Sequence, residues 1–250
     1  LPMSGMAAYT PGMEISGGSL GIGLGIAVGM CLGLKRKGSD RLVYNLMSDG
    51  ELGEGPTWEA AASAAHWKLG NLICMVDVNR MQADGPSTGV LNFEPLPAKW
   101  EAFGWHAQRV DGNDLGALLA VLGRAVELCR QGQGPFLVEA DTYRMQAHTN
   151  TDDPSRYRDD AEVKEWEARD PLRRMTAYLE STGALTEEVS AQIARDAEDV
   201  AQQLRDAMNA ETELDPLELF DHVYSVQTPQ LAAQRAQLAE ELSRSENQEA

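Results

Sequence analysis

The chain has 250 residues, of which 21 are basic and 39 acidic, giving a net charge of −18. This length leaves room for one large domain with a sizeable core, plus an appendage. The acidic balance argues against nucleic acid as a partner, because neutralising phosphates requires clustered Lys and Arg. Much of the acidity follows residue 150 and is typical of solvated helix faces.

The cysteines Cys31, Cys74 and Cys129 lie in apolar or helical contexts at wide spacing. They form neither a metal motif nor an even-numbered disulfide set, which predicts buried free thiols and a cytoplasmic protein. The chain opens Leu1-Pro2-Met3 without the basic start of a signal peptide. We expect an upstream part of the protein to be missing.

The first half alternates between helix-like and strand-like patterns. The expected elements, in chain order, are a loop over 1–16, a buried helix over 19–36, a strand over 41–47, a helix over 53–69, a strand over 71–78, a long connection over 80–97 with a turn at Asp84-Gly85-Pro86, a helix over 97–103, a strand over 106–110, a helix over 114–131 and a strand over 135–141. This alternation predicts an α/β fold with a doubly wound parallel sheet. Trp58, Trp67 and Trp100 are expected in its core.

Two stretches raise separate questions. Residues 17–34 carry no charge and could be read as a membrane span, but they are rich in glycine and Lys35-Arg36-Lys37 follows directly, so a buried helix against the sheet is the better interpretation. From Asp159 onward the pattern is purely helical, with Pro171 and Pro216 near helix starts. We therefore expect an α/β domain over residues 1–158 and a helical extension and tail over 159–250.

Two polar residues end neighbouring strands of the predicted sheet. Asp49 closes the apolar run that begins at Arg41, and Asn79 closes the run that begins at Asn71. Open α/β sheets bind ligands outside the carboxyl ends of their strands. One carboxylate and one amide oxygen suit Mg²⁺, which fills its remaining positions with phosphate oxygens and water. The pair predicts a phosphorylated cofactor held through a metal.

Three segments occur in the order found in thiamine-diphosphate-dependent enzymes, which this chain resembles: Gly18-Ser19-Leu20-Gly21-Ile22-Gly23, then Ser48-Asp49-Gly50-Glu51, then Asp77-Val78-Asn79. Ser48 replaces the first glycine of the family's Gly-Asp-Gly. The resemblance implies the diphosphate-binding domain of that fold, with Mg²⁺ held by Asp49, Asn79 and the backbone carbonyl of Met81. It also implies cofactor contacts from Gly18, Ser19, Leu20, Gly21, Gly50 and Glu51.

Residues 5–125 resemble the amino-terminal subunit of two-chain transketolases, on segments such as Thr10-Pro11-Gly12-Met13-Glu14 and Gln82-Ala83-Asp84-Gly85-Pro86. Arg80 departs from that pattern beside the expected metal. Residues 134–225 instead resemble the alpha subunit of 2-oxo-acid dehydrogenases, on segments such as Thr142-Tyr143-Arg144 and Leu219-Phe220-Asp221-His222-Val223-Tyr224. A chain that combines these two resemblances is either a natural composite or an engineered one.

The dehydrogenase resemblance places Arg144 and His148 near the cofactor's diphosphate, and His148 is the one candidate for a catalytic role in this chain. The alternatives are a structural ion pair for Arg144 and a surface loop position for His148. Charge-assisted hydrogen bonds from such side chains would suit phosphate oxygens.

In the resembled enzymes, the glutamate that activates the cofactor comes from a separate, pyrimidine-binding domain. No second α/β domain is visible here, so we expect an α₂β₂-like assembly with a partner subunit. The resemblances imply ketol transfer between sugar phosphates first, and decarboxylation of a 2-oxo acid with acyl transfer to a lipoyl domain second. A non-catalytic scaffold subunit is the third interpretation.

Overall fold

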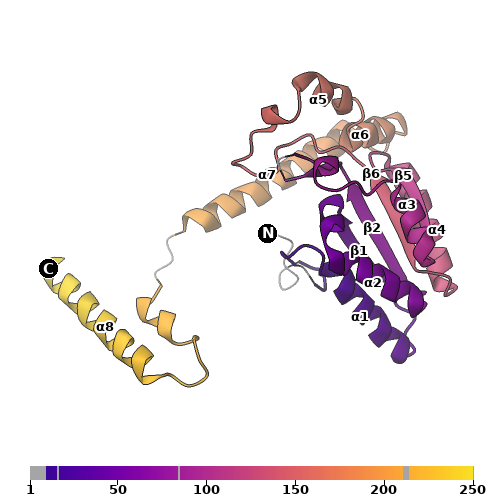
Figure 1. Ribbon diagram of the computed structural model, residues 1–250. Helices are drawn as coiled ribbons and strands as arrows, with labels where there is room; N and C mark the ends of the chain where they lie inside the picture. Colours follow the sequence, from indigo (N-terminus) through magenta and orange to yellow (C-terminus); the bar gives the residue numbers. More distant parts are fainter. Residues whose placement is uncertain (1–9, 16, 84, 211–213, 250) are drawn as a thin grey trace. The chain divides into compact units, whose positions relative to one another are not determined.

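The computed structural model describes residues 10–15, 17–83, 85–210 and 214–249 (Figure 1). By its internal contacts the chain divides into two compact units, residues 1–190 and 191–250, and each is considered by itself. Asp84, part of the predicted turn, lies outside the described residues, as do residues 1–9 at the start of the predicted loop.

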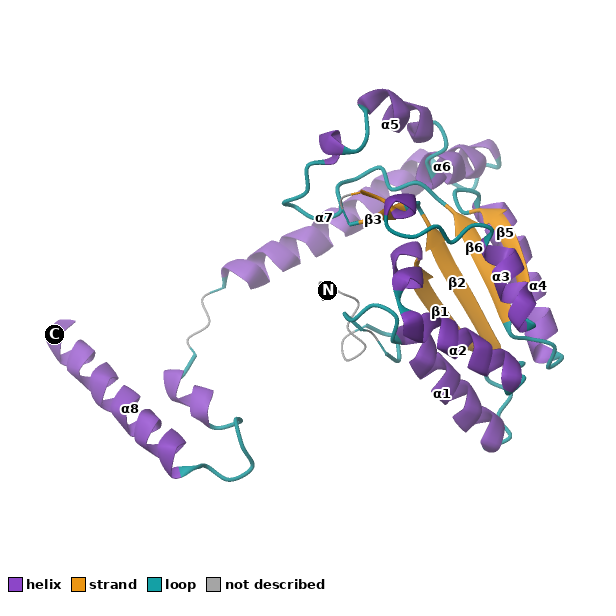
Figure 2. Cartoon of the chain, in the orientation of Figure 1, coloured by secondary structure: helices purple, strands orange, loops and turns teal. Residues whose placement is uncertain are grey.

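The first unit is built on a four-stranded parallel sheet, which confirms the predicted α/β class (Figure 2). Its strands are β1 (Val43–Ser48), β2 (Leu72–Val78), β5 (His106–Asp111) and β6 (Phe136–Asp141), in the order β1-β2-β6-β5. Ser48 pairs with Asp77, and Asp141 pairs with both Val78 and Asp111. The strands therefore end together, and the loops that follow them share one edge of the sheet.

Helices cover both faces of the sheet, as a doubly wound fold requires. On one face α1 (Gly23–Arg36), α2 (Gly55–His66) and α3 (Leu96–Phe103) pack in one core cluster with Cys74, Val76 and Leu137. On the other face α4 (Leu115–Arg130) packs with Ile73, Phe136 and Val138. Successive strand residues point to opposite faces, and both faces of β2 and β6 are buried, with Glu139 as the charged exception among apolar residues.

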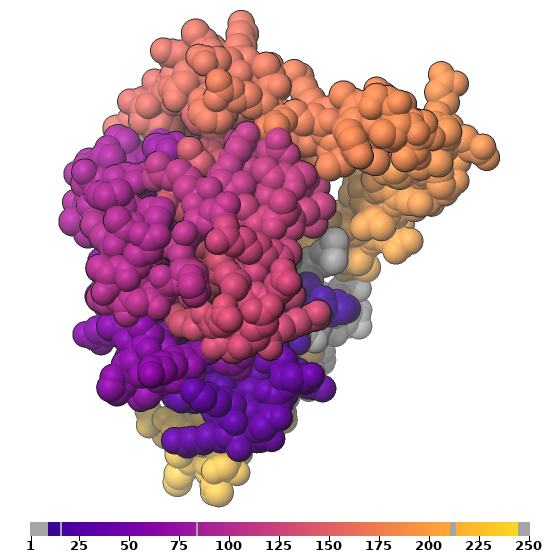
Figure 3. Space-filling model, turned by 90° about the vertical axis from the view of Figure 1, so that its right-hand side faces the viewer, coloured from indigo at the N-terminus to yellow at the C-terminus, as the bar shows by residue number. Residues whose placement is uncertain are grey.

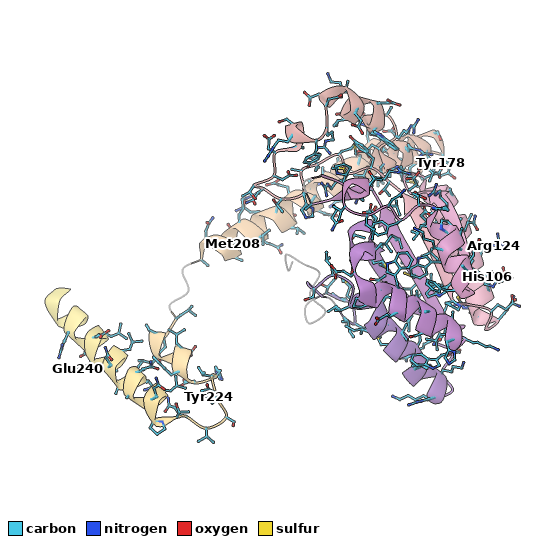
Figure 4. The ribbon with its side chains drawn as sticks, in the orientation of Figure 1. His106, Arg124, Tyr178, Met208, Tyr224 and Glu240 are labelled. Atoms are coloured by element: carbon cyan, nitrogen blue, oxygen red, sulfur yellow. The ribbon has the colours of Figure 1, made fainter. Side chains whose placement is uncertain are left out.

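The β5 edge of the sheet is lined by polar side chains. Figure 3 looks onto this side, where α3, β5 and α4 form a continuous surface. His106, at the start of β5, stacks on Phe136 with ring centroids 6.2 Å apart, and Arg124 of α4 donates to Gln108 at 3.4 Å (Figure 4). Polar groups along an edge strand discourage pairing with another sheet.

Several element boundaries differ from the sequence-based expectation for identifiable reasons. Helix α1 begins at Gly23 rather than residue 19, because Gly21 has φ +80°, and a Cβ added there would clash with the side chain of Glu54. Helix α2 ends at His66 because Lys68 adopts φ +49°. The prediction that Trp67 lies in the core was wrong: it follows the last helical residue and is 45 % exposed, whereas Trp100 is fully buried.

The long connection after β2 contains structure that periodicity did not reveal. A two-residue hairpin, β3 (Met81–Gln82) with β4 (Gly85–Pro86), leads into a short 3₁₀ turn, η2 (Ser87–Gly89). A second 3₁₀ turn, η1 (Asp49–Gly53), follows β1 directly. Both features lie at the strand ends where the polar residues were expected to gather.

After β6 the chain is helical, as predicted. The elements are η3 (Pro154–Arg156), α5 (Asp160–Glu167), α6 (Pro171–Ser181), α7 (Glu187–Asn209), η4 (Pro216–Phe220) and α8 (Pro229–Glu249). Pro171 and Pro216 occupy first-turn positions, where the missing N–H costs nothing. Within the second unit α8 packs against η4, and Arg235 Nε lies 3.8 Å from Asp221 Oδ1.

The three cysteines are buried free thiols, as expected. Burial raises the pKa of Cys31 and of Cys74 to about 12, and that of Cys129 to about 11. Among the described helices, none has the length and apolar character needed to cross a bilayer, which agrees with the interpretation of residues 17–34 as a helix packed on the sheet.

Candidate functional site

Asp49 and Asn79 leave adjacent strands at the same edge of the sheet. Asp49 directly follows β1 and opens η1, and Asn79 directly follows β2. Because Ser48 is paired with Asp77 in register, the two strands run side by side as they end. Asp49 is only 2 % exposed, so its carboxylate faces protein rather than solvent.

The carboxylate of Asp49 is stabilised in its charged form by the hydroxyl of Ser87 and by the backbone N–H groups of Arg80 and Gly50. Its Oδ2 accepts a hydrogen bond of 2.7 Å from the hydroxyl of Ser87, while its Oδ1 is buried without a hydrogen-bond partner. Burial is the main reason that the pKa of this carboxyl lies above its usual range. An unpartnered buried carboxylate oxygen is costly unless something compensates its charge. A small cation is a chemically suitable partner.

The space in front of Asp49 is small. It is a pocket of about 50 Å³ with a mainly apolar lining: Asp49, Leu52, Val78, Arg80, Ser87, Thr88, Leu91, Asn92, Phe93, Glu94 and Leu96. A volume of this size holds an ion or a water molecule but not an organic cofactor. Of the three predicted metal ligands only Asp49 lines this pocket, so the pocket does not by itself account for the predicted metal site.

Asn79 is held in a tight turn. Its side-chain Oδ1 accepts a 3.0 Å hydrogen bond from the backbone N–H of Met81, and the residue between them, Arg80, has φ +59°. An amide oxygen has two lone pairs, so this bond leaves one for a further partner. The predicted third ligand, the backbone carbonyl of Met81, belongs to the same turn.

The site contains no cluster of conventional metal ligands. In the part of the chain that the structure describes, no group of three or more His, Cys, Asp or Glu side chains could hold a metal. A site of this composition, with oxygen donors alone, would suit hard cations such as Mg²⁺, Ca²⁺ or Mn²⁺ better than zinc or copper, which favour nitrogen or sulfur donors. One carboxylate, one amide and one carbonyl leave room for the phosphate oxygens that Mg²⁺ favours.

The glycine-rich turn before α1 is tied to the strand end by Glu51. Glu51 Oε1 accepts from the backbone N–H of Gly21 at 3.0 Å, and Oε2 accepts from that of Ser48 at 3.2 Å. Both carboxylate oxygens are thus already engaged with backbone donors. The cofactor contact of Glu51 stays a prediction, and the geometry gives this residue a part in positioning the turn.

The remaining members of that turn differ in exposure. Gly18, Ser19 and Leu20 are exposed, and Gly21 is buried. Gly50 is buried as well, next to Gln82 of the hairpin. The exposed residues are accessible to a ligand, whereas Gly21 and Gly50 serve close packing between segments.

Arg144 and His148 lie together in the loop after β6. Arg144 Nη1 lies 3.2 Å from His148 Nδ1, and Nη2 donates to the carbonyl oxygen of Ala83 at 2.6 Å. The backbone N–H of His148 donates to Asp152 Oδ2 at 2.8 Å. Arg144 therefore joins the loop after β6 to the hairpin after β2, rather than forming the alternative ion pair with an acid.

Beside these residues lies a larger polar pocket of about 440 Å³, lined by Ala83, His148, Thr149, Thr151, Asp152, Asp153 and Arg156. The hydroxyl of Tyr157 donates to Asp152, which is the main reason that the pKa of this carboxyl is lowered. His148, Arg156 and the threonine hydroxyls are donors suited to an anion.

Ser87 was not found from the sequence, and for Arg80 only its position beside the site was noted, not its partner. Ser87 is 4 % exposed and bonded to Asp49, although no motif marked it. Arg80 Nη1 lies 2.7 Å from Asp141 Oδ1 at the end of β6, so the departure noted at Arg80 is used in an ion pair across the sheet edge. Neither contact could be read from spacing, because the partners are far apart in sequence.

Comparison with known proteins adds relatives of two kinds. Residues 3–216 match the family model described as the dehydrogenase E1 component. A putative uncharacterized transketolase family protein of Sinorhizobium fredii is 74 % identical over 125 residues, which cover 50 % of this chain and 45 % of the relative. The alpha subunit of 3-methyl-2-oxobutanoate dehydrogenase from Mycobacterium tuberculosis is 36 % identical over 220 residues, 88 % of this chain and 60 % of the relative.

A third relative is a subunit of the apulose-4-phosphate transketolase of Actinobacillus succinogenes. It is 42 % identical over 142 residues, which cover 57 % of this chain and 50 % of the relative. In all three cases the match covers between 45 % and 60 % of the relative's own length. Both predicted resemblances, to transketolase subunits and to dehydrogenase alpha subunits, are confirmed.

Proposed function

Because this chain belongs to the dehydrogenase E1 component family of thiamine-diphosphate-dependent enzymes, we propose that it is the magnesium- and diphosphate-binding subunit of a heteromeric enzyme. The single observation that carries the proposal is the buried carboxylate of Asp49, with Oδ1 unpartnered at the end of β1. A divalent cation there would compensate the buried charge and bridge to a diphosphate.

Each part of the site then has a role. Asp49, Asn79 and the carbonyl of Met81 would hold Mg²⁺, with Gly18–Gly21, Gly50 and Glu51 shaping the cradle around it. Arg144 and His148 would neutralise or order the diphosphate end. The bound cofactor would supply an electron sink for the negative charge that develops at the substrate's carbonyl carbon when the adjacent bond breaks.

A partner chain completes this proposal. The transketolase and dehydrogenase relatives are themselves named as single subunits of their enzymes, which implies companion chains in those proteins. We infer that a pyrimidine-binding partner, of the transketolase carboxy-terminal or dehydrogenase beta type, brings the activating glutamate in an α₂β₂-like assembly. Such an assembly would be cytoplasmic, in keeping with the free thiols.

The direct test is calorimetric titration of thiamine diphosphate into the complex with and without Mg²⁺. Replacing Asp49 by Ala should weaken the metal-dependent binding of thiamine diphosphate by more than about 100-fold. Loss of a contact that only supports a metal ligand costs about 10–100-fold, and here the ligand itself is lost. Asp40→Ala is the matched control, since Asp40 is exposed. A wild-type complex that binds neither component would leave only the non-catalytic scaffold interpretation.

For the reaction, we propose two-carbon ketol transfer between sugar phosphates as the first candidate. Support comes from the 74 % identity to a transketolase family protein and the 42 % identity to an apulose-4-phosphate transketolase subunit. The second candidate is decarboxylation of a 2-oxo acid with acyl transfer to a lipoyl domain. It is supported by the match over residues 3–216 and by the dehydrogenase alpha relative that matches 88 % of this chain.

Two parallel assays of the reconstituted complex separate these candidates. One contains xylulose 5-phosphate and ribose 5-phosphate, and the other contains pyruvate or a branched 2-oxo acid with an electron acceptor. Turnover in the first assay alone is expected. Turnover in the second alone would overturn ketol transfer and leave the cofactor site itself intact.

A further inference from the structure

Ser87 connects the two strand ends that carry the proposed metal ligands. Its backbone N–H donates to the carbonyl of Arg80 at 2.9 Å, and its Oγ donates to Asp49 Oδ2 at 2.7 Å. Its own carbonyl accepts from the backbone N–H groups of Val90 and Leu91 at 3.0 and 2.9 Å. At 4 % exposure the side chain is shielded from water, so these bonds do not compete with solvent.

The bond to Asp49 decides which carboxylate oxygen is available. A serine hydroxyl has one hydrogen to donate, and here it goes to Oδ2. The other oxygen, Oδ1, is buried without a hydrogen-bond partner. The hydroxyl of Ser87 therefore helps to hold the carboxylate in one orientation, together with the backbone N–H groups of Arg80 and Gly50 that also favour its charged form, and it leaves Oδ1 for a cation.

The bond to Arg80 fixes the second strand end. Arg80 lies in the left-handed region at φ +59°, inside the turn in which Asn79 accepts from Met81. Strained turns of this kind persist when surrounding contacts hold them. Ser87 supplies such a contact to the turn and also holds Asp49, so both ligand positions share one anchor.

We propose that Ser87 is a positioning residue that sets the geometry of the metal site by orienting Asp49 relative to the Asn79 turn. This inference rests on the proposed function, because it concerns the same cation. A purely structural role would lower the stability of the fold and leave the metal affinity of the folded protein unchanged. A positioning role lowers the metal affinity itself.

The test compares three variants of the full chain in complex with its partner. Ser87→Ala removes the hydroxyl, Ser87→Thr keeps it, and Ser190→Ala makes the same change at an exposed position of α7. The Kd for Mg²⁺ is measured by calorimetry at saturating thiamine diphosphate, and the spectrum of bound Mn²⁺ by electron paramagnetic resonance. Thermal unfolding without metal monitors folding of each variant.

We expect Ser87→Ala to weaken Mg²⁺ binding by about 10–100-fold, the range for loss of a contact that orients a metal ligand. Its Mn²⁺ spectrum should change, because the carboxylate reorients. Ser87→Thr should recover most of the affinity, and Ser190→Ala should match the wild type. If Ser87→Ala does not fold, Ser87→Cys takes its place, and it too should bind weakly because a thiol is a poor donor.

Two results would overturn the inference. One is a Ser87→Ala complex that binds Mg²⁺ as tightly as the wild type. The other is Ser87→Thr binding as weakly as Ser87→Ala, because the hydroxyl would then not be the determinant. Failure of the wild-type complex to bind Mg²⁺ with the cofactor is a different outcome, and it refutes the proposed function itself.

Discussion

Two regions of this chain are stabilised in different ways. Among the described residues, every buried residue lies between Gly21 and Glu139, and none follows Glu139. In the later region, α7 carries a stripe of apolar side chains that remain half or more exposed, with Ile193 at 57 %, Val200 at 52 % and Met208 at 78 %. The side-chain hydrogen bonds of α7 are local, such as the one from Gln202 to Asp206.

This difference in burial suits the two regions to different roles. The sheet region has its own core and can hold a ligand site rigidly, because its polar contacts join segments far apart in sequence. The apolar side chains of α7 named above are exposed among the described residues, and exposed apolar stripes on helices mark surfaces that contact other proteins. This matches the proposal that the chain acts with a partner.

The sharpest way to break this comparison is the same substitution in both regions. Val76→Asp places an unpaired carboxylate in the fully buried core and should cost more than about 4 kcal/mol, enough to unfold the domain. Val200→Asp lies on the exposed stripe and should change the free energy of unfolding by less than about 0.5 kcal/mol. Urea denaturation of the chain without its partner measures both. Equal losses would refute the division.

The ion pair between β5 and β6 provides a second test. Arg109 Nε lies 2.5 Å from Oε1 of the fully buried Glu139, and Arg109 also bonds Glu94 just before α3. Arg109→Ala should destabilise the domain by roughly 2–3 kcal/mol, less than for a fully enclosed pair because Arg109 is partly exposed. Arg124→Ala is the control, and it should stay within about 0.5 kcal/mol. A small loss at both positions would contradict the prediction.

The pH dependence of stability should report on Glu139. Burial raises its pKa above the ordinary 4.5, although the guanidinium of Arg109 opposes this, and Glu94 and Asp141 add to it. The unfolded chain therefore loses this proton first as pH rises. The contribution of Glu139 to stability is greatest below pH 4.5 and declines as pH rises through the raised folded pKa.

The unfolding free energies of wild type and Glu139→Gln should consequently diverge above about pH 4.5. Their difference should change by at most about 1.4 kcal/mol per pH unit, the limit for one titrating group. The measurement is the difference in unfolding free energy between the two proteins from pH 4 to 8. A difference that does not vary with pH would show that Glu139 titrates normally.

The smallest effect concerns the thiols of the sheet region. With pKa values of about 12, 12 and 11, Cys31, Cys74 and Cys129 contain almost no thiolate near neutrality. A thiol-specific reagent at pH 8 should label the folded chain very slowly and label all three after unfolding. Rapid labelling of the native protein would contradict the burial described for this region.

The sequence was sufficient for the main helices and strands of the sheet region and for the placement of Asp49 and Asn79 at the ends of adjacent strands. Long apolar runs such as Leu72–Val78 are recognisable as buried strands, and strands of a parallel sheet end at a common edge. The hairpin after β2 was not predicted, because each of its strands has two residues, too few to form a pattern. The start of α1 depended on Gly21 meeting Glu54, a contact between distant segments.

The contacts that support the site could not be predicted from the sequence for the same reason. Ser87 and Asp49 are 38 positions apart, and Arg144 and Ala83 are 61 apart, so no local rule joins them. Glu51 was recognised near the site, but its engagement with Gly21 and Ser48 follows only from the folded geometry. The order of residues yields candidate ligands, which stay a prediction, whereas the groups that position them emerge only from the folded structure.

Locating the bound cation would show whether Asp49 and Asn79 share one metal ion. Crystals of the complex grown with thiamine diphosphate and Mn²⁺ in place of Mg²⁺ would reveal the metal by its anomalous scattering. The account predicts one peak in coordination distance of Asp49 Oδ1 and the side-chain oxygen of Asn79, with the diphosphate on its other side. A peak elsewhere, or Asp49 and Asn79 too far apart to share one ion, would contradict it.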